Sequence, residues 1–251
     1  MLMEIPKDKK VYFASDNHLG APNSSDSLIR EKKFVKWLNE IRVDAHAIFL
    51  VGDIFDFWFE YKKVVPKGYV RLLGKLAELS DKGISIYIFT GNHDMWIFDY
   101  IETEINAHIY REPVQICLKE KHFYIGHGDG VGPGDKSYKI IKKIFQNKLC
   151  QWLFERVHPN LGISIAQYWS KKSRIANHEK NRNYYGDKEW LTQFCKQKMK
   201  TTDVDYFIFG HRHLPLEIDL GNQTKYINLG DWINYKSYAV FDGKKLKLKH
   251  Y

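Results

Sequence analysis

The chain has 251 residues, of which 44% are hydrophobic and 15% aromatic, and it carries 39 Lys and Arg against 30 Asp and Glu. These proportions suit a folded domain with a sizeable core and exclude both a disordered chain and a minimal scaffold. No stretch approaches the roughly 18 consecutive apolar residues of a membrane span, and residues 1–10 lack the apolar run of a secretion signal. Three cysteines without a C-x-x-C pair indicate neither a disulfide framework nor a thiolate zinc site. We therefore expect a cytoplasmic protein.

Short apolar runs alternate with helix-like stretches along the chain. The sequence predicts strands at 11–15, 47–51, 84–90, 123–126, 206–210 and 226–229, and helices at 28–41 and 69–79, where apolar residues recur at helical spacing. After Val204 the pattern favours strands, and those at 237–241 and 246–250 are joined by an Asp242-Gly243 turn. This order predicts an α/β sandwich, with a mixed sheet or two facing sheets, formed by one domain over residues 1–251.

Positive charge is concentrated in residues 136–200, which hold 15 Lys and Arg against 4 Asp and Glu, a net charge of +11, and the rest of the chain sums to −2. Such a segment attracts phosphate-bearing partners, although it can also be a merely solvated face. Residues 140–157 form a broad apolar helical stripe flanked by lysines. This helix can lie at a lipid headgroup boundary, cover a hydrophobic groove or simply pack on the sandwich. We expect residues 133–199 to form a helical insertion.

Five predicted strands are followed at once by residue types that bind metals. The donors are Asp16 and His18, Asp53, Asn92, His127, and His211 with His213, in the order of the strands. Each alone is better explained as a turn former, a helix cap or a buried histidine. Together they indicate a site, because loops at the carboxyl ends of strands converge in an α/β sheet.

Seven protein donors exceed the needs of one open tetrahedral site and suit two metal ions bridged by a carboxylate. Asp53 is the natural bridge, since a carboxylate can give one oxygen to each ion. The set contains imidazoles, carboxylates and an amide but no thiolate, which admits manganese, iron, zinc or cobalt.

The ordered motifs Asp-x-His, Gly-Asp, Gly-Asn-His-Asp, Gly-His and Gly-His-x-His, between residues 11 and 213, resemble those of the calcineurin-like metallophosphoesterase superfamily. The resemblance implies an α/β/β/α sandwich and the hydrolysis of a phosphoester or phosphoanhydride. It implies one metal held by Asp16, His18, Asp53 and His213, and another held by Asp53, Asn92, His127 and His211. It also implies that His93 acts catalytically, by stabilising or protonating the leaving oxygen.

Within the superfamily, the tract 52–58 and His127-Gly128-Asp129, followed by Asp135 and Tyr138, are similar to the UDP-2,3-diacylglucosamine diphosphatases. That family cleaves a pyrophosphate in lipid A assembly to give UMP and 2,3-diacylglucosamine 1-phosphate, using manganese at the cytoplasmic face of the inner membrane. The resemblance implies a nucleotide-linked glycolipid substrate, an anionic membrane surface as partner, a helical lid over residues 133–199, and substrate contacts from Asp135 and Tyr138. The enterobacterial form has Arg where this chain has His93.

Ser173 and Arg174 are further candidates for binding substrate. They follow two aromatic and two basic residues, Tyr168, Trp169, Lys171 and Lys172. This combination suits a uridine and pyrophosphate site, but surface lysines also produce it by chance.

Other interpretations stay open at this point. A cyclic nucleotide, a phosphoprotein or a nucleic acid would meet the same chemistry, but a nuclease explains the basic segment without explaining its apolar stripe, so we expect no nucleic-acid partner. A non-catalytic scaffold with this fold would need missing ligands, and none of the seven is missing.

Overall fold

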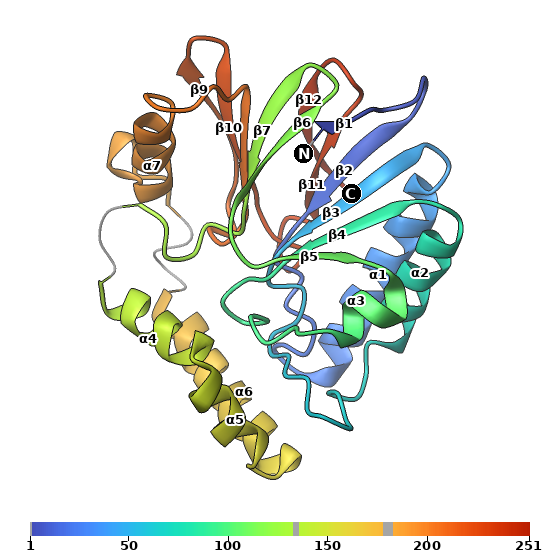
Figure 1. Cartoon of the computed structure of the whole chain (residues 1–251), viewed down its shortest axis with the longest axis vertical. Helices are drawn as coiled ribbons and strands as arrows, with labels where there is room; N and C mark the ends of the chain where they lie inside the picture. The colour runs from blue at the N-terminus through green and yellow to red at the C-terminus, as the bar shows by residue number, and fades with distance from the viewer. Residues whose placement is uncertain (1, 133–135, 178–182) are drawn as a thin grey trace.

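The computed structural model describes residues 2–132, 136–177 and 183–251. Two six-stranded sheets face each other, with helices on their outer sides (Figure 1). The first sheet has the order β1 (Leu2–Met3), β6 (Val114–Leu118), β7 (Lys121–Ile125), β8 (Tyr206–Phe209), β10 (Thr224–Leu229), β9 (Pro215–Gly221). The second has the order β12 (Leu246–His250), β11 (Ser237–Phe241), β2 (Lys10–Ala14), β3 (Ala45–Val51), β4 (Ser85–Phe89), β5 (His108–Tyr110). The predicted α/β sandwich is confirmed, as two facing sheets.

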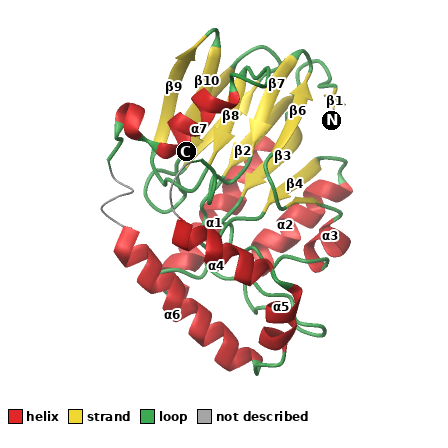
Figure 2. Cartoon of the chain, turned by 60° about the vertical axis from the view of Figure 1, so that its left-hand side comes forward, coloured by secondary structure: helices red, strands yellow, loops and turns green. Residues whose placement is uncertain are grey.

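Helices α1 (Ser24–Ile41), α2 (Val70–Asp81) and α3 (Tyr100–Ile105) cover the second sheet, and α7 (Trp190–Lys198), preceded by a short 3-10 turn at Gly186–Lys188, covers the first (Figure 1). Helices α4 (Lys136–Gln146), α5 (Lys148–Glu155) and α6 (Pro159–Asn177) lie together beside one end of the sandwich (Figure 2). Among the described residues, none of the helices is long and apolar enough to cross a membrane.

The sheets are held together by an aromatic and aliphatic core. The Phe13 ring stacks on Phe49 at a centroid distance of 5.1 Å and on Phe123 of the opposite sheet at 6.0 Å. The outer face of the second sheet buries Phe34, Trp37 and their neighbours on α1 and α2. Strands covered on both faces read as uninterrupted apolar runs, which explains why the central strands could be predicted.

The pairing places the functional loops. β2, β3 and β4 are parallel neighbours, as are β7 and β8, so their carboxyl ends point the same way within each sheet. The donor residues follow these five strands directly. The hairpin at Asp242-Gly243 joins β11 to β12 as predicted.

The helical stripe at 140–157 is not one helix, and this part of the prediction is wrong. It divides at Asn147, whose side-chain oxygen accepts the backbone N–H of Leu149 at 2.9 Å and caps the start of α5. The first part of the stripe is only partly packed, because Ile140 and Ile144 are 60% and 49% exposed whereas Phe145 packs against the aromatic cluster of Trp96.

Candidate metal centre

The loops that follow the five strands are joined by backbone hydrogen bonds at one end of the sandwich. The N–H groups of Asp16 and His18 donate to the carbonyls of Gly52 and Asp53 at 3.1 and 2.9 Å, and Gly210 donates to His127 at 3.0 Å. Gly52 has a φ of +84°, and a Cβ there would lie 2.5 Å from Nδ1 of His127. Only glycine lets the loops approach this closely.

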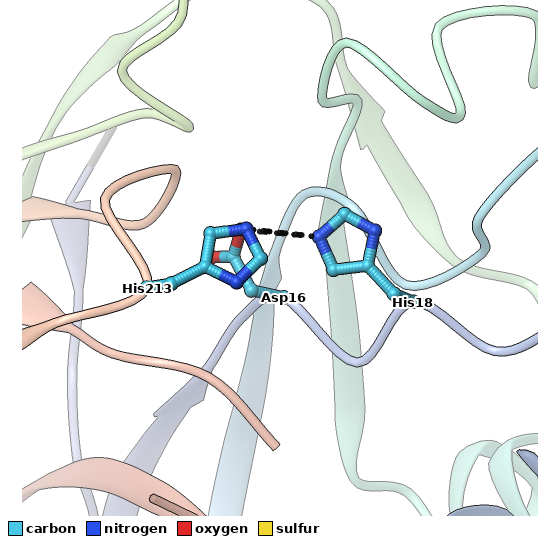
Figure 3. A group of neighbouring side chains, drawn as sticks. All are labelled: Asp16, His18 and His213. Carbon is cyan, nitrogen blue, oxygen red and sulfur yellow. Dashed lines mark hydrogen bonds and ion pairs between the residues drawn. The ribbon is translucent and has the colours of Figure 1, made fainter. Parts of the chain in front are cut away.

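Asp16, His18 and His213 form the first group of donors (Figure 3). The Nε2 atoms of His18 and His213 face each other at 3.2 Å, and Asp16 Oδ1 lies 3.6 and 3.4 Å from these two atoms. Two imidazole nitrogens and a carboxylate oxygen therefore surround one point.

Asp53, His127 and His211 form the second group, and Asn92 joins it through Oδ1, which lies 2.9 Å from Nδ1 of His211. The Asp53 Oδ2 atom is 3.2 Å from Nε2 of His127 and 3.6 Å from Nε2 of His18. One carboxylate thus stands between the two groups, so the structure brings together all seven predicted donors.

The chemistry of this set fits divalent cations. Asp16 Oδ1 and His127 Nε2 are buried without a hydrogen-bond partner among the described residues. Burial alone would raise the pKa of Asp53, but the imidazoles of His127 and His93 hold that pKa well below its usual value. Burial, with help from His127, lowers the pKa of His211 to about 4, so this imidazole is neutral, the form that binds metals. Buried anionic oxygens and unpaired ring nitrogens are costly unless a cation satisfies them.

Five of the seven donors have left-handed backbone, with φ of 55° at Asp16, 43° at His18, 51° at Asp53, 66° at His211 and 52° at His213. Such a conformation costs on the order of 1 kcal/mol or more at a residue with a Cβ, and it persists only where the surrounding structure imposes it. Here the imposed backbone points the side chains toward one another.

Several residues that orient the donors were not found from the sequence. Asp231 Oδ2 lies 3.2 Å from Nδ1 of His213, which leaves Nε2 of that ring facing the first group. The Val51 carbonyl does the same for His127, whose Nδ1 is 2.9 Å away. The far ring nitrogen of a metal-binding histidine is commonly held this way, which fixes the tautomer. No local signal marks Asp231, because its pairing with His213 depends on the tertiary fold.

Asp94, the last residue of the Gly-Asn-His-Asp motif, supports the loop that carries Asp53. Its carboxylate accepts the N–H groups of Ile54 and Gly91, each at 2.7 Å. Burial and the nearby Asp53 charge raise the pKa of Asp94 to about 7.

His93 lies beside both groups. Its backbone N–H donates to Asp53 Oδ1 at 2.8 Å, and its ring centroid is 4.8 Å from that of His18. The Nδ1 atom is 3.1 Å from the carbonyl oxygen of Asp56 and 3.1 Å from the hydroxyl of Ser170 on α6. Because a carbonyl only accepts, Nδ1 carries the proton and Nε2 is left for another partner. Burial lowers the pKa of His93.

Of the predicted substrate-binding residues, Arg174 lies beside the donor groups. Arg174 on α6 forms an ion pair with Asp56, whose Oδ1 is 3.4 Å from Nδ1 of His18. Tyr138 lies to one side, where its hydroxyl donates to Asp129 Oδ2 at 2.5 Å. Ser173 lies on α6. Asp135 falls outside the described residues.

Sequence reasoning missed Asp56 and Ser170, both of which are buried here. Asp56 lies in the Gly-Asp tract and Ser170 precedes Arg174 by one helical turn, so only the docking of α6 shows that they meet.

The two facing sheets carry carboxylate, amide and imidazole donors at their strand ends. This combination of fold and site is that of a metal-dependent phosphoesterase. The chain belongs to the calcineurin-like phosphoesterase family, whose model matches residues 9–215, and the resemblance seen in its motifs is confirmed. It is similar to a protein of Porphyromonas gingivalis called UDP-2,3-diacylglucosamine hydrolase, at 41% identity over 96% of this chain and 97% of that one. Proteins of the same name from a Shewanella species and from Histophilus somni are 27% and 26% identical over 89% of this chain and 89% and 92% of theirs.

Proposed function

We propose that this chain hydrolyses the pyrophosphate of UDP-2,3-diacylglucosamine to UMP and 2,3-diacylglucosamine 1-phosphate in lipid A biosynthesis. The observation that carries the proposal is the 41% identity to a UDP-2,3-diacylglucosamine hydrolase over nearly the whole length of both chains. The site supports it, because grouped divalent-metal donors suit the hydrolysis of a phosphoric anhydride.

We assign one metal to Asp16, His18, Asp53 and His213, and a second to Asp53, Asn92, His127 and His211, with manganese as the ion used and iron, zinc or cobalt as alternatives. Cations held by these residues would supply positive charge for the phosphate oxygens and lower the pKa of the attacking water. The place of Asp53 between the two groups supports its role as the bridge.

His93 acts on the leaving group. Its Nδ1 is held by the Asp56 carbonyl, so the ring is oriented and Nε2 can face the substrate. A phosphate anion near this ring favours its protonated form, which then stabilises or protonates the leaving oxygen. The Ser170 hydroxyl on α6 helps to hold the same ring.

The helices of residues 133–199 act as a lid that receives the acyl chains. Phe57, Phe59, Tyr61 and Trp96 form an apolar cluster near the site, and Phe145 and Phe154 of α4 and α5 pack against it. Trp96 Nε1 also donates to the Phe145 carbonyl at 2.8 Å. An apolar cluster shared by the helices and the sandwich suits a lipid chain.

The exposed apolar side chains of α4, α5 and α6 support contact with a membrane. They are Ile140, Ile141, Ile144, Leu149, Trp152, Leu153, Leu161, Ile165, Tyr168 and Trp169. The segment also carries the excess of positive charge. Apolar and basic groups together favour an anionic membrane surface, and we propose peripheral association at the cytoplasmic face of the inner membrane.

Substrate contacts are assigned to Asp135, Tyr138, Ser173 and Arg174. The position of Arg174 beside Asp56 supports its part of this assignment, since a guanidinium at the edge of the donor groups can turn toward a phosphate of the substrate.

The test is UMP release by purified protein supplied with Mn²⁺ and UDP-2,3-diacylglucosamine in detergent micelles, followed by chromatography. The expected result is release of UMP, with far lower turnover of UDP-N-acetylglucosamine, which lacks the two acyl chains. Absence of UMP, or equal turnover of acylated and unacylated substrates, contradicts the proposal. Cyclic nucleotides and phosphopeptides, assayed in parallel, test the alternatives within the family.

A further inference from the structure

A recess adjoins the second donor group at His127. It has a volume of about 310 Å³, and its wall includes His127 of the second donor group. The rest of the lining comes from residues 89–90, 111–113 and 128–131 of the sandwich and from α4. Ligand pockets range from roughly 300 to 1,000 Å³, so this one suits a compact group rather than a pair of acyl chains.

The face that α4 turns toward this pocket is the basic one. Lys139, Lys142, Lys143 and Gln146 line the pocket, at the i, i+3, i+4, i+7 spacing of a single helix face. The isoleucines of the same helix are exposed. An amphipathic helix usually turns its apolar side toward the protein. At the pocket, α4 instead turns its basic side toward the sandwich.

Much of the positive charge in the pocket is not neutralised. Lys142 pairs with Asp129 at 2.8 Å, but Lys139 and Arg111 donate to neutral carbonyls, of Gly132 at 2.6 Å and of Ile97 and Phe98 at 3.0 and 2.8 Å. Among the described residues, neither Arg111 nor Lys143 has a carboxylate within ion-pair distance. Glu112 is the remaining acidic residue among the described residues of the lining, which therefore offer three such cations against one carboxylate.

The two sides of the donor groups therefore differ in chemistry. Near His93, the apolar cluster of Trp96 lies beside the Ser170 hydroxyl and the ion pair of Arg174 with Asp56. On the His127 side lies the cationic pocket. A substrate cleaved at a phosphate linkage extends in both directions from the donor groups, and each half meets one of these environments.

We infer that the cationic pocket, formed by α4, the Arg111 segment and the loop after His127, binds the nucleoside monophosphate half of the substrate. The inference rests on the proposed function, since that function supplies a substrate with one lipid half and one nucleotide half. Lysine and arginine donors suit the phosphate, the ribose hydroxyls and the two carbonyl acceptors of uracil. The small volume suits the nucleotide better than the diacylated half.

The experiment measures inhibition by UMP and by inorganic phosphate, with the Mn²⁺-loaded full chain and a small chromogenic phosphodiester as reporter substrate. UMP is expected to inhibit more strongly than inorganic phosphate, because the nucleoside adds contacts in the pocket. In Lys143→Glu the inhibition constant for UMP should rise about tenfold or more, equivalent to roughly 1.4 kcal/mol, with a much smaller change for inorganic phosphate. Lys139→Ala provides a second variant in case the charge reversal disturbs folding.

The matched control is Lys148→Glu, which makes the same charge change at a residue outside the pocket lining. It should leave both inhibition constants unchanged. Equal inhibition by UMP and inorganic phosphate, or the same effect of Lys143→Glu and Lys148→Glu on UMP, overturns the inference.

The assay needs no lipid substrate, so its result is independent of the proposed function. If UDP-2,3-diacylglucosamine is not cleaved but UMP binding still depends on Lys143, the proposed function is wrong and the nucleotide pocket stands. If the lipid substrate is cleaved and UMP binding is indifferent to Lys143, only the pocket assignment fails.

Discussion

Asp53 reaches both donor groups with one carboxylate, at 3.6 Å from Nε2 of His18 and 3.2 Å from Nε2 of His127. Its other oxygen accepts the backbone N–H of His93, which keeps the carboxylate from rotating. A side chain held at both oxygens is preorganised to be shared by two cations.

Asp53→Ala removes that shared oxygen while the other donors stay in place. We expect turnover to be abolished together with metal occupancy, because each ion loses a ligand and their mutual repulsion is no longer screened. Metal content by elemental analysis and turnover of a small phosphodiester give the two readouts. A fully active Asp53→Ala enzyme refutes the shared-carboxylate account.

His93→Ala should behave differently. The ring lies outside the seven donors, so the metals should remain bound while kcat falls by about 10² to 10⁴-fold, the range typical for loss of a general acid. Metal analysis and steady-state kinetics on the same preparation separate the two effects. Loss of metal in His93→Ala would instead assign the histidine to the ligands, and an unchanged kcat would remove it from the mechanism.

At the level of elements, α5 and α6 dock on the site through aromatic and ionic contacts. The Phe154 ring of α5 lies 4.8 Å from Phe59 and 4.9 Å from Trp96, centroid to centroid. On α6, Arg174 pairs with Asp56. The helices are therefore fixed to the two loops that also carry Asp53 and His93.

Phe154→Ala should loosen this docking and open the apolar cluster. We expect KM for the diacylated substrate to rise about tenfold, because truncating a packed aromatic costs several kcal/mol, only part of which is felt in binding. Kinetics in detergent micelles with the lipid substrate, and with a small phosphodiester for comparison, provide the measurement.

Lys148→Ala, on the same helix but exposed, is the control and should change the kinetics of neither substrate. If Phe154→Ala reduces the turnover of both substrates equally, the cluster serves packing rather than the acyl chains.

The elements that could be predicted are those whose surroundings are uniform. β2, β3 and β4 are covered on both faces and appear in the sequence as apolar runs, whereas β9 alternates between half-buried and exposed residues, and β1 and β5 have two and three residues. The seven donors follow directly from strand ends, so local patterns found them. Asp56, Asp231 and Ser170 act on partners in other loops or helices, and no local pattern reports such pairs.

At the scale of the molecule, the metal centre joins the two sheets. Asp16, His18, Asp53 and Asn92 follow strands of the second sheet, and His127, His211 and His213 follow strands of the first. Under the proposed assignment, cations held between them would connect the layers at one end of the sandwich.

Chelation should therefore lower the melting temperature. A ligand present at about 100 times its dissociation constant stabilises the folded state by about 2.7 kcal/mol, and each kcal/mol shifts Tm by roughly 2–4 °C at this chain length. A fall of about 5–10 °C on addition of EDTA, reversed by Mn²⁺, is the expected calorimetric result. If EDTA removes the metal but leaves the melting temperature unchanged, the proposed connection between the sheets is wrong.

The left-handed backbone at Asp16, His18, Asp53, His211 and His213 has a consequence for stability. Glycine adopts that conformation without strain, but it has no side chain with which to hold an ion. The most stable sequence for this fold is therefore not the active one. Replacing these donors by glycine would relieve backbone strain and could raise thermal stability at the cost of activity.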